Sequence, residues 1–513
     1  TLYNIMKTLY NPLTHAGNHP RMRDVQTMYT KERAMTKHIL SSRHHVPADI
    51  DRVWDFFSRA ENLGRLTPSS MGFEIHTPEP TTTAGSTIDY TLRPLFGIPT
   101  GWRTRIETVD APSRFSDVQE KGPYKSWVHE HRFTEVEGGV RMDDRVEYEM
   151  PFGPIGSLGH RLFVENQLQY VFGFRASAVD NIFEPAGNLD GAAPGSIAVA
   201  GGTGFVGGEI ARELRRRGRH VIVLSSRGER ARGQLPDDIE IRTADVGDSD
   251  SLRAALQGID ELVISLAFPG SPIEQPKKGF TFDNVDAAGT ERVVAAGREA
   301  GVGKVVYISG AGASHDAERH WFRAKARAED AVRGSGMRWT VIRPTWVFGP
   351  GDVSLNRFLG FARVLPFVPL TNFGDQRLAP VYVRDVATLA ADSLEQEAAV
   401  EQTFEIGGPE ELSMREILHR AMDVAGTRKL LLPAPAPLVK LAAWPMRFLP
   451  HPPLSPDAVD FVNQPATVDL GPLLERMPRN LTRLEDGLGR YLGPEHTTVT
   501  ISEAASEKVG AAA

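Results

Sequence analysis

The chain has 513 residues, enough for two or three domains, and its 41% hydrophobic and 24% charged residues are the ordinary balance of a globular protein. Its 58 basic residues do not exceed its 65 acidic residues, which argues against a nucleic-acid partner. The sequence contains no cysteine, so disulfides, thiol nucleophiles and cysteine metal sites are excluded, and a reducing, cytoplasmic location is favoured.

The two ends of the chain lack a clear apolar period. Residues 1–35 mix polar residues with Asn, His and Pro, and we expect them to be poorly ordered. We expect the tail, residues 494–513, to be disordered as well. No run of 18 apolar residues is present, so no transmembrane helix is predicted. Peripheral membrane contact and the oligomeric state stay open.

The first domain, residues 36–184, has the pattern of an α+β unit. Residues 41–46 read as a strand, and apolar residues then recur with helical spacing over 50–57. A long helix at about 155–183 closes the unit. Four strand-like runs lie between the two helices, at 87–92, 101–109, 126–135 and 140–150.

His129 and His131 lie two residues apart on one of these predicted strands, so both side chains point to the same face. No third ligand stands nearby in the sequence. We therefore interpret the pair as structural or pocket-lining residues and predict no metal site.

The local sequence of this domain resembles the START/Bet v 1-like superfamily, and within it the polyketide cyclase/dehydrase-like (SRPBCC) members. The resemblance lies in Pro47-Ala48, in Gly122-Pro123 leading to Trp127, and in the stretch DDRVEYEMPFG at 143–153. It implies a helix-grip fold, in which a curved sheet and a long helix enclose an apolar cavity for a hydrophobic small molecule or lipid. Residues 185–195, rich in Gly and Pro, are the predicted linker to a second domain.

The second domain, residues 196–493, opens on an apolar strand that runs into closely spaced glycines and then a helix (IAVAGGTGFVG). Strand, glycine turn and helix are the context that a dinucleotide fingerprint requires. In that role, Gly201 allows the tight turn, Gly204 lets amides approach a pyrophosphate, and Gly207 lets the helix pack on the sheet. The alternative is a purely structural glycine turn. The predicted cofactor loop comprises Gly201, Thr203, Gly204, Phe205, Val206 and Gly207.

Strands alternate with helical segments through the rest of this domain, which predicts a doubly wound parallel sheet. Ser226 and Arg227 follow the second strand, where an acidic residue would bind a free ribose 2′-hydroxyl. A guanidinium and a hydroxyl suit a 2′-phosphate instead, so NADP(H) is favoured over NAD(H). The alternative is a solvated basic loop.

Residues 196–490 resemble the atypical short-chain dehydrogenases/reductases, and among them the NDUFA-nine-type accessory subunit of respiratory complex I. The stretches WTVIRPTWVFGPGD, RVLPFVPL, PVYVRDVA and FEIGGPEELSMREIL carry the similarity. It implies an NAD(P)-binding Rossmann domain with a small C-terminal substrate subdomain. It also assigns further cofactor contacts to Asp245, Val246, Leu266, Ala267, Lys325 and Pro344.

Enzymes of this superfamily use a Tyr-x-x-x-Lys pair and a preceding Ser. Here Lys325 is present and Ser309 ends a predicted strand, and these two are the catalytic candidates. Trp321 stands where the Tyr is expected, and an indole N–H is a donor that does not titrate in water. A proton would then come from His315, His320 or water.

Our leading interpretation is an NADP(H)-binding, oxidoreductase-like protein that acts on or senses a hydrophobic molecule bound by its START-like domain. If it is an enzyme, it is an NADP-dependent oxidoreductase or an epimerase/dehydratase-like protein without the usual Tyr. The alternatives are a non-catalytic NADP(H)-binding scaffold or regulatory protein, and a lipid or hydrophobic-ligand carrier.

Overall fold

The structure is a computed structural model that describes residues 37–68, 71–78, 80–95, 98–187, 195–268, 274–364, 367–444, 459–460, 462–492 and 498–503. The N-terminal arm that we expect to be poorly ordered lies outside these residues, as do 188–194 of the predicted linker. None of the described helices is both long enough and apolar enough to span a membrane.

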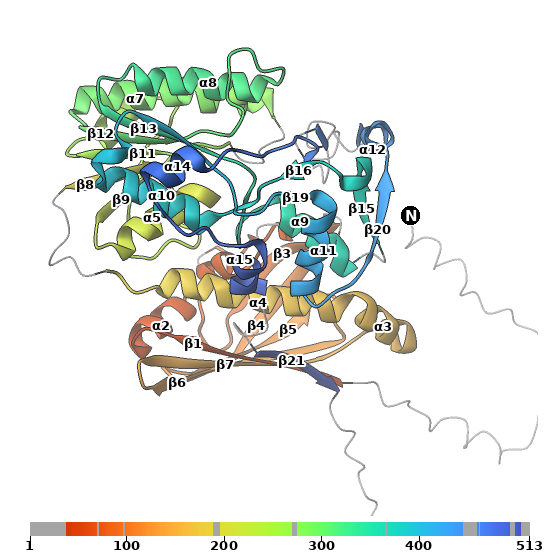
Figure 1. The fold of residues 1–513 in the computed structure, drawn as a ribbon. Coiled ribbons are helices and arrows are strands. Elements are labelled where there is room, and N and C mark those ends of the chain that lie inside the picture. The colour runs from red at the N-terminus through yellow and green to blue at the C-terminus, as the bar shows by residue number, and fades with distance from the viewer. Residues whose placement is uncertain are drawn as a thin grey trace, which may run out of the picture.

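The first domain is one antiparallel sheet with a long helix packed on one face (Figure 1). The strands lie in the order β2-β3-β4-β5-β6-β7-β1-β21. Side chains of β6 alternate between buried and exposed, as a strand with one covered face requires. The strands are β1 (Lys37–Val46), β2 (Glu74–Ile75), β3 (Thr87–Leu95), β4 (Ile98–Asp110), β5 (Arg114–Lys121), β6 (Ser126–Val136), β7 (Gly139–Glu149) and β21 (Thr498–Glu503).

The long helix, α4 (Glu165–Phe183), lies across this sheet and buries Phe172, Val179 and Ile182 against it. It continues from α3 (Gly153–Gly159) through a π turn over His160–Val164, so the single helix expected from the sequence is interrupted. A short helix, α2 (Ile50–Phe57), closes one end of the sheet. The helix-grip fold is thus confirmed.

The C-terminal segment corrects one expectation. Residues 494–513 were expected to be disordered, but Thr498–Glu503 forms β21 and pairs antiparallel with β1 of the first domain. Val499 and Ile501 pack beside Tyr148 and Leu40. The strand thus completes the sheet by pairing with an edge that lies far away in the sequence.

The second domain is a seven-stranded parallel sheet in the order β10-β9-β8-β11-β12-β13-β18. Helices cover both faces, which confirms the doubly wound Rossmann fold (Figure 1). The strands are β8 (Ser196–Ala200), β9 (His220–Ser225), β10 (Glu240–Thr243), β11 (Glu261–Ile264), β12 (Lys304–Ile308), β13 (Arg338–Pro344) and β18 (Gln402–Ile406). The main helices are α5 (Phe205–Arg216), α6 (Ser249–Ala255), α7 (Ala288–Ala300), α8 (His320–Arg333) and α10 (Val383–Glu395).

A smaller lobe follows β13 and has a core of its own. Phe348, Leu359, Ile417 and Leu488 are buried in that core. The lobe lies over α4 of the first domain (Figure 1). Its elements are α9 (Ser354–Val364), β15 (Phe367–Thr371), α11 (Met414–Val424), β20 (Leu430–Ala434), α12 (Ala436–Ala443), α15 (Leu484–Leu492) and the paired short strands β14 (Val347–Phe348) with β17 (Val381–Tyr382) and β16 (Arg377–Leu378) with β19 (Leu412–Ser413).

The two domains share a polar contact centred on Arg65. Its Nε donates to the carbonyl of Gly233 at 2.6 Å, its Nη2 donates to that of Leu235 at 2.9 Å, and Asp237 pairs with its Nη1. Close by, Asn181 Nδ2 donates to Gln234 Oε1 at 3.0 Å. These contacts hold the first domain against the loop that follows β9.

Candidate functional site, a dinucleotide cleft

A cleft of about 1120 Å³ opens at the carboxyl ends of the parallel strands and continues toward the smaller lobe. This edge of a doubly wound sheet is where such folds bind ligands. Both catalytic candidates, Ser309 and Lys325, line it together with Trp321. Of the predicted cofactor contacts, the cleft is lined by Gly201, Thr203, Gly204, Phe205, Val206, Ser226, Arg227, Asp245, Val246, Leu266, Ala267, Lys325 and Pro344.

The glycine loop is shaped by backbone contacts that leave no room for side chains. Gly201 has φ of 82°, and a Cβ there would lie 2.2 Å from the carbonyl oxygen of Ser265. Gly207 does not line the cleft but packs closely on the loop, where a Cβ would lie 2.3 Å from the Gly201 carbonyl oxygen. Gly202, which the sequence analysis did not single out, is pressed against Val223. Together these glycines let α5 begin directly behind the loop, with its N-terminus toward the cleft.

Arg227 lies exposed on the rim of the cleft beside Ser226. Within the described part of the chain, its guanidinium forms no ion pair. Arg232 of the same loop is differently placed, because Glu229 and the carbonyls of Pro236 and Ile239 occupy its guanidinium. Arg227 is therefore available to an anionic ligand, and Arg232 is a structural residue.

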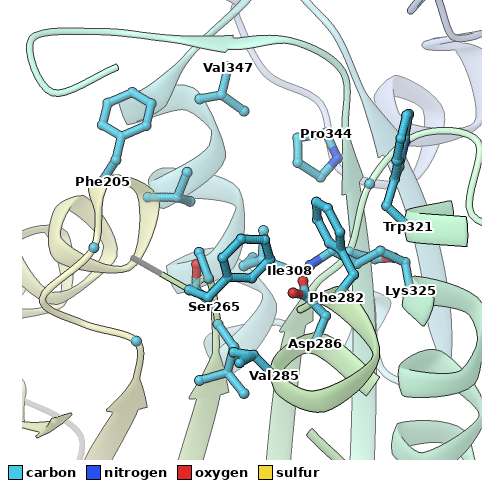
Figure 2. Close-up of a pocket in the computed structure, with 18 of the residues that line it drawn as sticks. Phe205, Ser265, Phe282, Val285, Asp286, Ile308, Trp321, Lys325, Pro344 and Val347 are labelled. Atoms are coloured by element: carbon cyan, nitrogen blue, oxygen red, sulfur yellow. Dashed lines mark ion pairs between the residues drawn. The ribbon is translucent and has the colours of Figure 1, made fainter. Parts of the chain in front are cut away.

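Lys325 projects from α8 toward Asp286 at the base of the cleft (Figure 2). Its Nζ lies 2.6 Å from Asp286 Oδ1 and 5.5 Å from the ring centroid of Tyr307. Burial disfavours the ammonium, but the Asp286 carboxylate outweighs this effect and raises the pKa of Lys325. Burial raises the pKa of Tyr307 to about 12. The cleft therefore contains a lysine that stays charged, held by a carboxylate that the sequence analysis missed.

Ser309 is hydrogen-bonded to a second buried carboxylate. Its Oγ donates to Glu329 Oε1 at 2.6 Å, and Arg343 donates two hydrogen bonds to the same carboxylate. Burial opposes ionisation of Glu329, but Arg343 and Ser309 hold its pKa below the ordinary value. The hydroxyl proton of Ser309 is thus committed to Glu329, and Ser309 can polarise a substrate oxygen only by giving up this bond.

An aromatic cluster forms the wall opposite the glycine loop. Phe268 and Phe282 pack edge to face at 5.0 Å, and the ring of Trp321 lies 6.1 Å from that of Phe282 (Figure 2). The other proton sources we considered do not line the cleft: His315 pairs with Asp330, and His320 Nε2 lies 3.3 Å from Glu274. The wall is consequently apolar where the family's acid is expected.

The smaller lobe adds residues that no sequence motif indicated. Asp352 caps α9 by accepting from the amide of Leu355 at 2.7 Å, and burial raises its pKa to about 7. Arg357, one turn further along α9, also lines the cleft, and burial lowers its pKa. It makes no ion pair with any residue the structure describes. An unpaired guanidinium in a cleft is a candidate contact for an acidic group of a ligand.

Comparisons with known proteins agree with this arrangement. Residues 201–357 match a family described as NAD(P)H-binding, and residues 37–179 match one described as polyketide cyclase/dehydrase and lipid transport. The chain is 32% identical over 229 residues to the (4-alkanoyl-5-oxo-2,5-dihydrofuran-3-yl)methyl phosphate reductase of Streptomyces griseus, covering 43% of this chain and 70% of that protein. The chain is an atypical short-chain dehydrogenase/reductase fused to a polyketide cyclase-like domain.

Other members of this family, and a solved structure, are similar over the second domain. The Arabidopsis thaliana mitochondrial NADH dehydrogenase (ubiquinone) 1 alpha subcomplex subunit 9 is 28% identical over 259 residues, which cover 49% of this chain and 63% of that protein. The crystal structure of Citrobacter sp. triphenylmethane reductase with NADP(H) is 21% identical, with a TM-score of 0.47, over 58% of this chain and 100% of that chain.

As an atypical short-chain dehydrogenase/reductase, the protein departs from the superfamily pattern at one position of the Tyr-x-x-x-Lys pair. Lys325 is present and ion-paired, whereas Trp321 is 6% exposed and packs in the aromatic wall. The Tyr307 ring centroid lies 5.5 Å from the Lys325 Nζ, but Tyr307 is buried and does not line the cleft. The lysine and the glycine loop of the family pattern are thus retained, and a tryptophan stands in place of the tyrosine.

Proposed function

We propose that the protein is an NADP(H)-dependent reductase of a hydrophobic molecule. The observation that carries this proposal is the continuity of the cleft. It runs from the glycine loop past the paired Lys325 and the aromatic wall to the smaller lobe. Its volume exceeds the roughly 300–1,000 Å³ of an ordinary single-ligand pocket, which supports room for a cofactor and a second molecule.

The residues of the cleft fit a bound NADP(H). The loop at Gly201–Gly207 and the N-terminus of α5 suit the pyrophosphate, and Arg227 with Ser226 suits a 2′-phosphate. The ammonium of Lys325, fixed by Asp286, suits the nicotinamide ribose. The cofactor, when bound, supplies a hydride.

In this proposal the protein's own groups position the substrate and stabilise charge. The rings of Phe282 and Trp321 bind its apolar part, and the Lys325 ammonium stabilises negative charge that develops on an oxygen. Arg357 offers a contact for an acidic substituent. No described acid replaces the missing tyrosine at the wall, and in this proposal the proton comes from water in the open cleft.

The choice of substrate class rests on two further observations. The Streptomyces reductase is named for a substrate with an alkanoyl group and a phosphate, which the aromatic wall and Arg357 could match. The first domain matches a family described as polyketide cyclase/dehydrase and lipid transport. This match supports the delivery of an apolar ligand by that domain. The cytoplasmic location expected from the sequence remains a prediction.

A specific observation favours a second candidate. Trp321 removes the family's acid, and the similar plant protein is a subunit of a respiratory complex. The protein would then bind NADP(H) as a scaffold or sensor and would not turn it over. In a third candidate, a hydrophobic-ligand carrier, the second domain would only control ligand release.

The two leading candidates differ in hydride transfer. We expect the full chain, incubated with NADPH deuterated at the nicotinamide and a panel of alkanoyl ketones and conjugated enones, to place deuterium in an extracted product. Lys325→Met should abolish transfer, whereas Lys277→Met, which changes a lysine outside the cleft lining, should not. Tight NADPH binding without deuterium transfer to any acceptor would favour the scaffold, and absence of NADPH binding would contradict both.

A further inference from the structure

The first domain contains a buried cluster of histidines and carboxylates far from the dinucleotide cleft. Asp117 lies on β5 directly opposite His129 on β6, and Asp144 lies on β7 opposite His131. All four side chains point to the face that α4 covers, because Arg175 of α4 contacts the same cluster. The sequence analysis found no third ligand for the histidine pair because the carboxylates come from neighbouring strands.

Three of these side chains converge on one point. Asp117 Oδ2 lies 3.4 Å from His131 Nε2 and 3.7 Å from His129 Nδ1. These separations are longer than good hydrogen bonds. They match the spacing of about 3.4 Å between ligand atoms that bonds of about 2.1 Å to one tetrahedral metal ion would produce.

Asp144 behaves as a supporting carboxylate rather than a ligand. It accepts from His131 Nδ1 at 2.6 Å, on the ring edge opposite the one that faces Asp117. Arg175 Nε lies 3.8 Å from its other oxygen and balances its charge. A histidine that turns one nitrogen to a carboxylate and presents the other to a common point is the arrangement that fixes metal-binding imidazoles.

The remaining features of the cluster also suit a cation. His129 is 7% exposed, and its Nε2 makes no hydrogen bond within the described part of the chain but lies 3.4 Å from Asp144 Oδ1. With Asp144 neutralised by Arg175, Asp117 is left as the negative charge facing two imidazoles. Its side chain is 13% exposed. Phe115 stacks on His131 at 4.2 Å and restricts water on the other side.

We propose that Asp117, His129 and His131 form a binding site for a divalent transition-metal ion, such as zinc, inside the START-like domain. Two histidines and one carboxylate are a usual donor set for such ions. Three protein ligands leave a coordination position free, which a water molecule or an oxygen of the domain's ligand would fill. This site is independent of the NADP(H) cleft and of the function proposed for it.

The test is metal binding by the full chain after chelator treatment. We expect one Co²⁺ per chain, with the visible absorption bands of a low-coordinate site, and displacement of Co²⁺ by Zn²⁺. His131→Gln and Asp117→Asn should each weaken binding at least about 100-fold, since even a supporting residue contributes about 10- to 100-fold. Asp117→Asn keeps the side-chain shape and is the variant of choice if His131→Gln unfolds.

His44→Gln is the matched control. His44 belongs to the same domain and also pairs with a carboxylate, Asp180 at 2.8 Å, but it lies outside the cluster of Asp117, His129 and His131. This variant should bind Co²⁺ like the wild type. Failure of the wild type to bind stoichiometric Co²⁺ or Zn²⁺, or equal binding by folded Asp117→Asn, would overturn the proposal.

Discussion

Trp321 is the residue where the cleft differs most from a Tyr-Lys site. It sits one helical turn before Lys325 on α8 and packs against Phe282. The indole keeps the aromatic wall intact while removing a titratable hydroxyl. The charged lysine and the glycine loop remain. The replacement at position 321 therefore removes a proton donor and leaves the expected cofactor-binding residues in place.

Trp321→Tyr should raise the rate of carbonyl reduction. The new hydroxyl would lie near the Lys325 ammonium, which lowers the tyrosine pKa from about 10 and makes the group a general acid. General acid catalysis contributes roughly 10²–10⁴-fold, so a steady-state NADPH oxidation assay would detect the gain. Trp321→Phe is the control without a hydroxyl. An equal gain in both variants would mean that the indole merely blocks the substrate space.

Arg227→Ala should weaken NADPH binding and leave NADH binding unchanged. Hydrogen bonds to charged groups contribute about 1.5–3 kcal/mol, so the NADPH dissociation constant should rise about 10- to 150-fold. Calorimetric titration of both cofactors measures this. Arg230→Ala changes a neighbouring exposed arginine outside the cleft lining and should have no effect. Equal affinity of the wild type for NADH and NADPH would refute the 2′-phosphate role.

At the scale of elements, β21 covers an edge that the first domain would otherwise expose. Lacking it, β1 would present unpaired backbone groups to solvent. Removing residues 498–513 should lower the melting temperature by several degrees, since Val499 and Ile501 together contribute roughly 2–4 kcal/mol by burial. A truncation after Glu503 is the control and should melt like the full chain. Unchanged melting of the longer truncation would show that β21 adds no stability.

The contact between β1 and the π turn predicts that the folded protein loses stability at acid pH. His38 stacks on His160 at 3.7 Å, and His160 Nε2 accepts from the Tyr148 hydroxyl at 2.7 Å. Burial lowers the pKa of His160 from 6.5 to about 4. Between these values the unfolded chain binds a proton that the folded chain does not, so stability decreases as pH falls from 6.5 to 4.

This loss should reach about 3 kcal/mol, at 1.36 kcal/mol for each pKa unit. Urea unfolding of the wild type and of His160→Gln, followed by near-ultraviolet circular dichroism at several pH values, measures it. The variant should show little of this decrease in stability. Burial also lowers the pKa of His38, so His38 should account for the decrease that remains. The same pH profile in both proteins would contradict the assignment.

At the scale of the whole molecule, Arg65 joins the helix-grip domain to the Rossmann domain. Its side chain is 13% exposed and bonds two carbonyls and a carboxylate of the loop after β9. Because that loop follows Arg227 closely, the contact connects the first domain to the rim of the cofactor cleft.

Arg65→Ala should loosen the interface without unfolding either domain. The carbonyls of Gly233 and Leu235 would lose a charged donor, and hydrogen–deuterium exchange in residues 228–239 should increase. Arg59→Ala is the control, since Arg59 forms its ion pair with Asp55 of its own domain. Exchange that rises equally in both variants would show that Arg65 does not hold the domains together.

The sequence by itself determined the two fold classes, and it indicated the glycine loop and the lysine of the candidate cleft. The helical spacing over 50–57 is a local pattern, because it puts the apolar side chains on one face for burial. The glycines from 201 to 207 are also a local pattern, because backbone sterics there admit no side chain. Lys325 could be assigned because its spacing from Trp321 is a property of one helix.

Only the tertiary structure decided which distant groups meet. Asp286 reaches Lys325 from another segment, Asp117 and Asp144 reach the histidine pair from neighbouring strands, and β21 adds to a sheet that began more than four hundred residues earlier. None of these contacts has a signature in local spacing. They depend on strand order and register, which are set by burial of the whole core.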